Sequence, residues 1–171
     1  MFRKVTFLFL LFLITPQIVF ARITPDDILR DKKEAYQKVF VNYSKPSQDK
    51  LTSLSDQIAK INKKRTDELS QLMFTQGEIL DEYQKRKEIT LKSTDGITRD
   101  LQDPVENARY WITYAHEAIA YQAAKIYVID LSTEANLKSD AQSTINLFKS
   151  ELESTRNKVI KSQKILLETL K

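Results

Sequence analysis

The chain has 171 residues, with 27 Lys and Arg, 23 Asp and Glu, one His and no Cys, and a formal net charge of +4. Zero cysteine excludes a disulfide scaffold, Cys-ligated zinc and thiol catalysis, and a single histidine makes a His-based metal site or triad hard to build. Two glycines are too few for a turn-rich sheet fold or a Gly-rich phosphate loop, so the composition predicts an all-α protein.

The first 21 residues have the pattern of an export signal. Two basic residues precede an apolar run over 7–14, and small or short side chains lead to Ala21. We expect signal peptidase to cleave between Ala21 and Arg22, which makes the mature protein secreted or periplasmic. An uncleaved anchor is the alternative, but the stretch 5–20 is shorter than the roughly 20 apolar residues that span a bilayer. We therefore predict no stable membrane span after cleavage.

Apolar periodicity and proline positions organise residues 22–171 as a single helical domain. Apolar side chains recur at three- and four-residue intervals, and Pro25 and Pro104 are well placed as first helical residues. The fold expected from this pattern is an elongated up-and-down bundle of four to five helices with coiled-coil-like packing. The expected helices cover approximately 25–43, 48–89, 104–131 and 140–170.

The long helix 48–89 has a seam close to a/d spacing that skips Arg65 in a step resembling a stutter. Gly77 lies inside this helix, where it marks a bend or a close helix crossing, or divides the segment into two helices. Ser47 is the expected N-cap of this helix, and Ser139 that of the last one. The expected seam consists of Leu51, Leu54, Ile58, Ile61, Leu69, Leu72, Ile79 or Leu80, and Tyr83.

Three segments lack a clear helical pattern. Ser93-Thr94-Asp95-Gly96 is a strong turn signal between the second and third helices. The run 126–129 has a strand-like composition, as does 89–91. A small two-stranded element is therefore the alternative to a third helix that continues to residue 131.

Enzymatic motifs are incomplete. His116-Glu117 begins like a zinc-protease helix, but Ala120 occupies the position of the second histidine. Adjacent acidic doublets point about 100° apart on a helix, and the Glu-x-x-His pattern of di-iron bundles is absent. We expect no enzymatic activity, no metal and no cofactor.

Two basic triplets lie 22 residues apart on the helix 48–89, within about 40° of the same face. This candidate basic surface consists of Lys63, Lys64, Arg65, Lys85, Arg86 and Lys87. Carboxylates four residues away neutralise much of it, so we expect a solvated helix face and no nucleic-acid partner. The expected pairs are Lys63 with Asp67, Lys64 with Glu68, Lys85 with Asp81, and Arg86 with Glu82.

The helix 104–131 is apolar on more than one side. Small and β-branched residues form one seam, and nearly opposite this seam lies a second stripe, formed by Tyr110, Tyr114, Tyr121 and Val128. Other helices cover both faces if this is the central helix of the bundle. The functional alternative is an exposed stripe that docks a protein partner, because tyrosine is favoured at interfaces.

Two short stretches, 23–27 and 51–55, are similar to the Leu-Thr-x-x-Gln motifs of Spy-type periplasmic chaperones, although both lack the final Gln. The resemblance implies a client-holding role, and no functional residue is carried over from it. The expected function is protein–protein contact, as a structural or adaptor component of a cell envelope or secreted assembly. A periplasmic holdase-type chaperone is the alternative. Homo-oligomers are also open, because a second copy would complete the seams of the helices 48–89 and 140–170.

Overall fold

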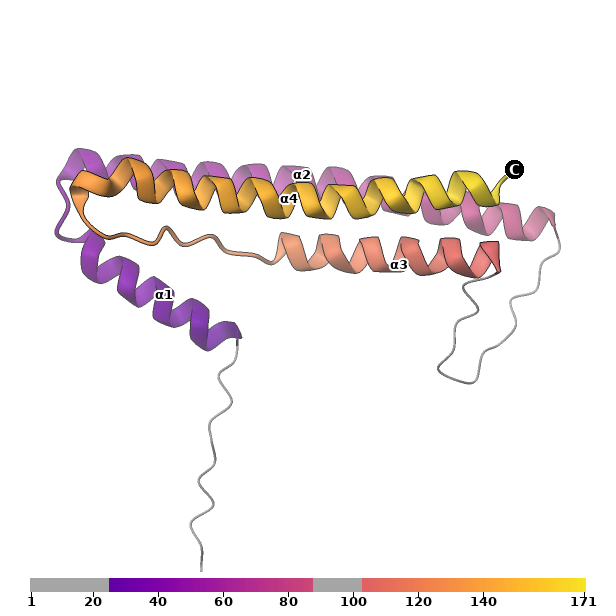
Figure 1. The fold of residues 1–171 in the computed structure, drawn as a ribbon, viewed down its shortest axis with the longest axis horizontal. Helices are drawn as coiled ribbons and strands as arrows, with labels where there is room; N and C mark the ends of the chain where they lie inside the picture. The colour runs from indigo at the N-terminus through magenta and orange to yellow at the C-terminus, as the bar shows by residue number, and fades with distance from the viewer. Residues whose placement is uncertain (1–24, 88–102) are drawn as a thin grey trace, which may run out of the picture.

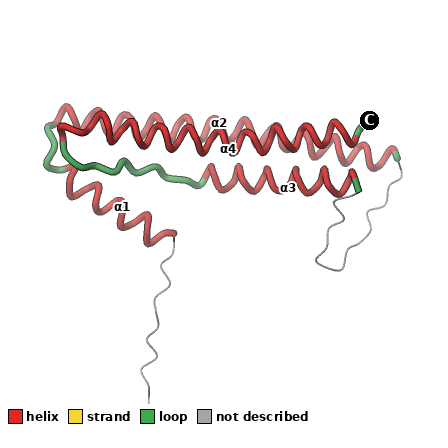
Figure 2. The backbone as a smooth tube through the Cα atoms, in the orientation of Figure 1, coloured by secondary structure: helices red, strands yellow, loops and turns green. Residues whose placement is uncertain are grey.

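The computed structural model describes residues 25–87 and 103–171. Four helices, α1 (Pro25–Phe40), α2 (Lys45–Arg86), α3 (Pro104–Ala123) and α4 (Leu137–Thr169), pack against one another. The long helices α2 and α4 run in the same direction, and α3 runs the opposite way along one half of them (Figure 1). The described residues contain no strand, as Figure 2 shows, which confirms the predicted all-α class. The export signal and the turn signal at 93–96 lie outside the described residues.

The connection between α1 and α2 has the expected length but lies three residues earlier in the chain. Helix α1 ends at Phe40, and Tyr43 beyond it is buried. Helix α2 begins at Lys45 with Ser44 as its N-cap, so the expected cap at Ser47 is wrong. Pro46 does not break the helix, because it lies in the first turn of α2, where a backbone N–H would have no intrahelical partner.

Helix α2 is continuous through Gly77, so the alternative of two separate helices is wrong. A Cβ added at Gly77 would meet no heavy atom within 4 Å. The expected close helix crossing is therefore also wrong. Helix α2 ends at Arg86, three residues before the expected end at 89.

Helix α3 ends at Ala123, and the expected continuation to residue 131 is wrong. Residues 125–133 are extended, with Ile129 and Leu131 buried while Ile126 and Asp130 are exposed. This alternation is typical of extended chain and agrees with the β-branched composition of the run. Nine extended residues span about 30 Å, against about 14 Å as helix. The segment thus follows the rest of α2 and returns the chain to the start of α4.

Helix α4 begins three residues before the expected start at 140. A 3₁₀ turn, η1 (Glu134–Asn136), leads directly into Leu137, and Asn136 is the N-cap instead of Ser139. The Asp140 carboxylate, in the first turn of α4, accepts hydrogen bonds from the Ser132 N–H (2.9 Å) and hydroxyl (2.8 Å). It therefore holds the end of the extended segment against the first turn of α4.

The core is a row of three apolar clusters along the bundle, and polar side chains separate them. The first joins α1 and the extended segment to α2, and the other two lie where α3 covers α2 and α4. A buried hydrogen bond from Ser162 to Gln76, 2.8 Å long, lies between the second and third clusters. The buried members are Tyr43, Leu51, Ile129 and Leu131, then Met73, Ala115, Ile119 and Val159, then Leu80, Val105, Ala108 and Leu166.

The inward seam of α2 differs from the expected one. Leu51, Ile58 and Leu80 are buried as expected, but polar side chains continue the seam between and beyond them. Several of these polar groups have hydrogen-bond partners, which makes their burial tolerable: Asn62 donates to a carbonyl of α3, Thr66 to a carbonyl of its own helix, and Gln76 accepts from α4. The buried polar members are Asn62, Thr66, Gln76 and Gln84, while Ile61, Leu72 and Ile79 are exposed.

Candidate partner-binding surface

Helix α3 carries the candidate surface, and both of its ends are fixed. At its start, the Asp103 carboxylate accepts hydrogen bonds from the N–H groups of Val105 (2.8 Å) and Glu106 (3.3 Å), as expected for an N-cap. The Thr169 hydroxyl at the end of α4 donates to the Pro104 carbonyl (3.0 Å). The first turn of α3 is therefore held against the last turn of α4.

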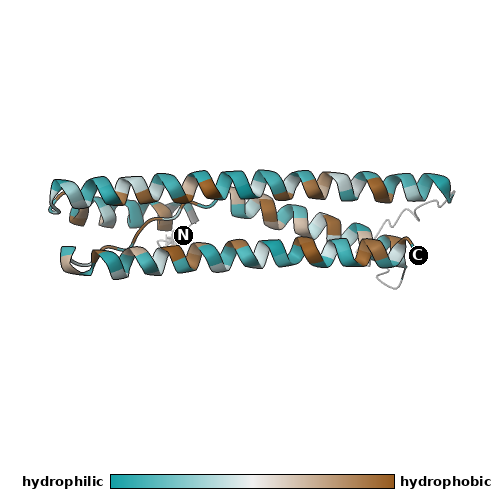
Figure 3. Ribbon diagram, turned by 90° about the horizontal axis from the view of Figure 1, so that it is seen from above, coloured by the Kyte–Doolittle hydropathy of each residue, from teal (hydrophilic) through white to brown (hydrophobic). Residues whose placement is uncertain are grey.

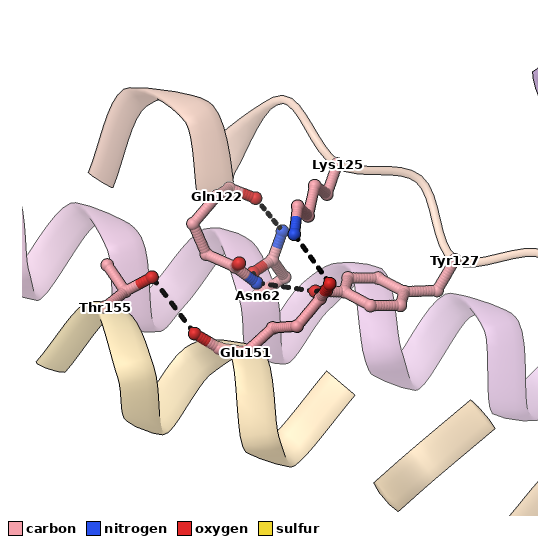
Figure 4. Close-up of polar contacts among 6 residues, drawn as sticks. All are labelled: Asn62, Gln122, Lys125, Tyr127, Glu151 and Thr155. Carbon is pink, nitrogen blue, oxygen red and sulfur yellow. Dashed lines mark hydrogen bonds and ion pairs between the residues drawn. The ribbon is translucent and has the colours of Figure 1, made fainter. Parts of the chain in front are cut away.

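A buried polar network holds the other end of α3 (Figure 4). The Asn62 amide of α2 donates to the Gln122 carbonyl (2.9 Å), and the Gln122 amide donates to Asn62 Oδ1 (3.0 Å) and to the Tyr127 hydroxyl (2.7 Å). Tyr127 in turn donates to Glu151 of α4 (2.6 Å), which also pairs with Lys125 (2.7 Å). The network joins three helices at the point where α3 gives way to the extended segment.

Both titratable acids of the network have shifted pKa values. Burial, followed by the hydrogen bond to Glu151, raises the pKa of the Tyr127 phenol well above its ordinary value of 10.0. Burial on its own would raise the pKa of Glu151. Hydrogen bonds from Lys125 and Tyr127, with the charge of Lys125, outweigh it and lower that pKa below 4.5. Tyr127 thus remains a donor, and Glu151 an ionised acceptor, at neutral pH.

The lowered pKa of Glu151 predicts an acid-sensitive bundle. A carboxyl whose pKa is lower in the folded state stabilises that state above its unfolded pKa, and this stability is lost as pH falls through the folded value. We expect the free energy of unfolding, measured with urea, to decrease below about pH 4.5 and to decrease less steeply in Glu151→Gln. Parallel pH profiles for the two proteins would contradict this assignment.

Three aromatic side chains gather on the outer side of α3. The Tyr110 and Tyr114 rings are stacked with centroids 6.1 Å apart, and Trp111 meets both edge-on, at 5.6 and 5.5 Å. Tyr110 and Trp111 are half-buried, and Tyr114 is 37% exposed. Because these offset-stacked and edge-to-face contacts fix the rings mutually, the cluster is a rigid apolar platform.

Two lysines of α4 complete this platform. The Lys161 ammonium lies 3.7 Å from the centroid of the Trp111 ring, and the Lys158 ammonium lies 5.1 Å from that of Tyr114. Trp111, Tyr114 and both lysines line a shallow depression between α3 and α4, together with polar residues of α4. We call this feature the aromatic–lysine surface, and it consists of Tyr110, Trp111, Tyr114, Lys158 and Lys161.

The structure retains most of the expected stripe and loses one member. Tyr110, Tyr114 and Tyr121 share one side of α3, and Tyr121 is 70% exposed, with the Lys125 ammonium 4.8 Å from its ring centroid. Full burial of the stripe by other helices is therefore wrong. Val128 lies beyond the end of α3 in the extended segment, so its assignment to a helical stripe is wrong too.

The lysines that face the rings are not predicted by the tyrosine stripe. Lys158 and Lys161 are three residues apart on α4, a spacing that places two side chains on one side of a helix. Nothing in the spacing shows which side of α3 they approach, because that depends on how the two helices are aligned. Trp111 is not part of the expected stripe, yet it is the centre of the cluster because its ring contacts both tyrosines.

All six members of the candidate basic surface are exposed, in two separate groups, with five of them on α2 and Lys87 as its C-cap. Two expected ion pairs are confirmed, Lys63 with Asp67 (2.9 Å) and Arg86 with Glu82 (3.0 Å). The other two are wrong, because Glu68 pairs with Arg65 (2.8 Å) and Asp81 with Arg109 of α3 (2.7 Å). Intramolecular carboxylates therefore occupy much of this surface.

Comparison of the chain with protein-family models, with curated proteins and with solved structures finds no match. Across residues 25–87 and 103–171, no helix combines the length and hydropathy that a bilayer crossing requires. Among these same residues, no three His, Asp or Glu side chains come together in a way that would hold a metal ion. The cleavage residues Ala21 and Arg22 lie outside the described residues.

Proposed function

We propose that this chain is an exported helical-bundle protein that works by protein–protein contact, as a structural or adaptor component of a cell envelope or secreted assembly. Export is inferred from the signal pattern in residues 1–21, which makes the mature protein secreted or periplasmic. The contact site is inferred from one observation, the rigid and partly exposed platform of the aromatic–lysine surface. No enzymatic activity and no cofactor belong to this proposal.

The bundle supplies a stiff support for such a contact. Inward residues of α4 recur every seven positions, which favours coiled-coil-like packing against the other helices. A surface carried by two packed helices loses little conformational freedom when a partner binds. The heptad members of α4 are Ala141, Phe148, Thr155, Ser162 and Thr169.

The chemistry of the aromatic–lysine surface defines the kind of partner that fits it. Rigid aromatic rings bury apolar area at a small entropic cost, which makes them typical anchors of interfaces. The ammonium groups of Lys158 and Lys161 lie over these rings and attract carboxylates. The proposed partner is therefore a protein segment that presents acidic side chains next to apolar ones.

Charge reversal tests the proposed contact. We expect Lys158→Glu combined with Lys161→Glu, and separately Tyr114→Ser, to weaken binding of the partner by about tenfold or more, with unchanged helicity and melting temperature. The measurement is crosslinking pull-down from the native compartment with stoichiometry determined. Phe74→Ser is the matched control, since Phe74 is an exposed aromatic residue on α2. Equal capture by all variants, or a large loss of stability in Tyr114→Ser, contradicts the proposal.

The holdase alternative predicts a different result. A chaperone suppresses the aggregation of several unrelated unfolded proteins at near-stoichiometric ratios, whereas an adaptor binds one defined partner at a fixed ratio. Light scattering of two or three unfolded clients, with and without the purified chain, separates these functions. We expect no general suppression.

A further inference from the structure

A groove between α2 and α4 is lined by residues of these two helices alone. Figure 3 looks onto the α2–α4 pair from above, and α3 lies on the lower side of the pair in Figure 1. The half-buried Leu69 and Leu152 line the groove, together with charged side chains of both helices. Five exposed large apolar residues of α2 and α4 recur at helical spacing with the groove-lining residues, which places them on the same outward side of the two helices. They are Ile61, Leu72, Ile79, Ile160 and Leu167.

Core contacts show how α2 and α4 are aligned along the bundle. Met73 shares a cluster with Val159, Leu80 shares one with Leu166, and Gln76 bonds to Ser162. In each of these pairs the α4 residue comes 86 positions after the α2 residue. Because the two helices run in the same direction, this offset identifies residues at the same height.

At nearly the same offset, the outward residues of α2 and α4 form complementary pairs, in which a charge is matched with the opposite charge and an apolar side chain with another apolar one. Each α4 residue comes 88 positions after its α2 counterpart, only two residues or about 3 Å from level alignment. One turn earlier Ile61 corresponds to Lys149, so the match begins at Arg65. The matched pairs are Arg65 with Glu153, Glu68 with Arg156, Leu72 with Ile160, Thr75 with Gln163, and Ile79 with Leu167.

We propose that this groove binds a second copy of the chain, packed in parallel about a two-fold axis along the bundle. That rotation places α2 of each copy opposite α4 of the other at the same height, so every matched pair forms twice. An antiparallel dimer would instead place α2 against α2. If centred on Leu72, it would bring Arg65 against Ile79, a charge against an apolar side chain. The parallel arrangement is therefore favoured.

The charged residues of the groove are available for this exchange. Within one chain they make only local contacts, Arg65 with Glu68 (2.8 Å) and Arg156 with Glu153 (3.6 Å), and all four side chains are exposed. The matched stretch from Arg65 to Ile79 is about 21 Å long, so the interface is smaller than that of an obligate dimer. We expect a weak dimer with a Kd of about 1–100 μM.

Sedimentation equilibrium of the chain purified after export, over about 1–500 μM, tests this dimer. Leu72→Asp and Ile160→Asp are expected to raise Kd at least about tenfold, whereas Phe74→Asp, on another side of α2, leaves it unchanged. Circular dichroism verifies that each variant is folded. A monomer at all concentrations, or equal effects of Leu72→Asp and Phe74→Asp, overturns the proposal. Because Leu72 is outside the aromatic–lysine surface, this result is independent of the proposed partner contact.

Two further experiments test the parallel orientation. Arg65→Glu and Glu153→Arg should each weaken the dimer, and the double variant should restore it, although both local ion pairs stay broken. The chain has no cysteine, so Thr75→Cys and Gln163→Cys can be mixed under oxidising conditions. We expect a disulfide between the two different variants and little in either variant alone. Efficient crosslinking of Thr75→Cys to itself overturns the parallel arrangement.

Discussion

Replacing Ile129 with alanine is expected to lower the free energy of unfolding by about 2–5 kcal/mol, the usual cost of a cavity left by a buried aliphatic side chain. Ile129 is 1% exposed and lies in the first apolar cluster with Tyr43 and Leu51. Half-buried residues of α1 also pack against this cluster. The extended segment is thus a part of the core to which α1 is attached.

Ile126→Ala provides a matched control, because Ile126 belongs to the same segment and is 55% exposed. We expect it to change the free energy of unfolding by no more than about 0.5 kcal/mol. The measurement is urea unfolding followed by circular dichroism. Equal costs for the two substitutions would contradict the inward and outward alternation of the extended segment.

Gln122→Leu is expected to cost about 1–3 kcal/mol, because it leaves buried polar groups without partners. Gln122 is 1% exposed, and its amide is the donor to both Asn62 Oδ1 and the Tyr127 hydroxyl. Leucine is close in size, so the loss is mainly one of hydrogen bonds and much less one of packing.

The double variant Asn62→Leu with Gln122→Leu tests this explanation. Replacing both partners by apolar groups of similar shape leaves fewer unsatisfied atoms than replacing one. We expect the double variant to cost at least about 1 kcal/mol less than the sum of the two single costs. Urea unfolding of the four proteins gives the coupling energy. Strictly additive costs would show that the two amides do not act as a unit.

Much of the fold is readable from the sequence. Periodic apolar residues and the Asp103-Pro104 start are local signals, and they located all four helices within a few residues at most ends. The end of α3 was missed because a run of β-branched residues has the same hydrophobicity in a helix and in an extended segment. The point at which the chain leaves α3 is fixed by the hydrogen bonds that Gln122 and Tyr127 make with Asn62 and Glu151, which are distant in sequence.

The polar part of the core was not predictable from apolar periodicity. Asn62 and Gln122 are residue types that usually lie at the surface, and only their mutual hydrogen bonds make burial favourable. Only the tyrosines of the aromatic–lysine surface were predictable from the sequence. Tyr110 and Tyr114 follow from helical spacing, whereas the approach of Lys161 to Trp111 depends on the alignment of α3 with α4.

Site-specific photocrosslinking in the native compartment tests the central claim most directly. A photoreactive amino acid replaces Tyr114 in the aromatic–lysine surface, and in a separate variant it replaces Phe74 as the control. The proposed function predicts one defined protein adduct from position 114 and none of that mass from position 74. No adduct from position 114, or the same set of adducts from both positions, would contradict it.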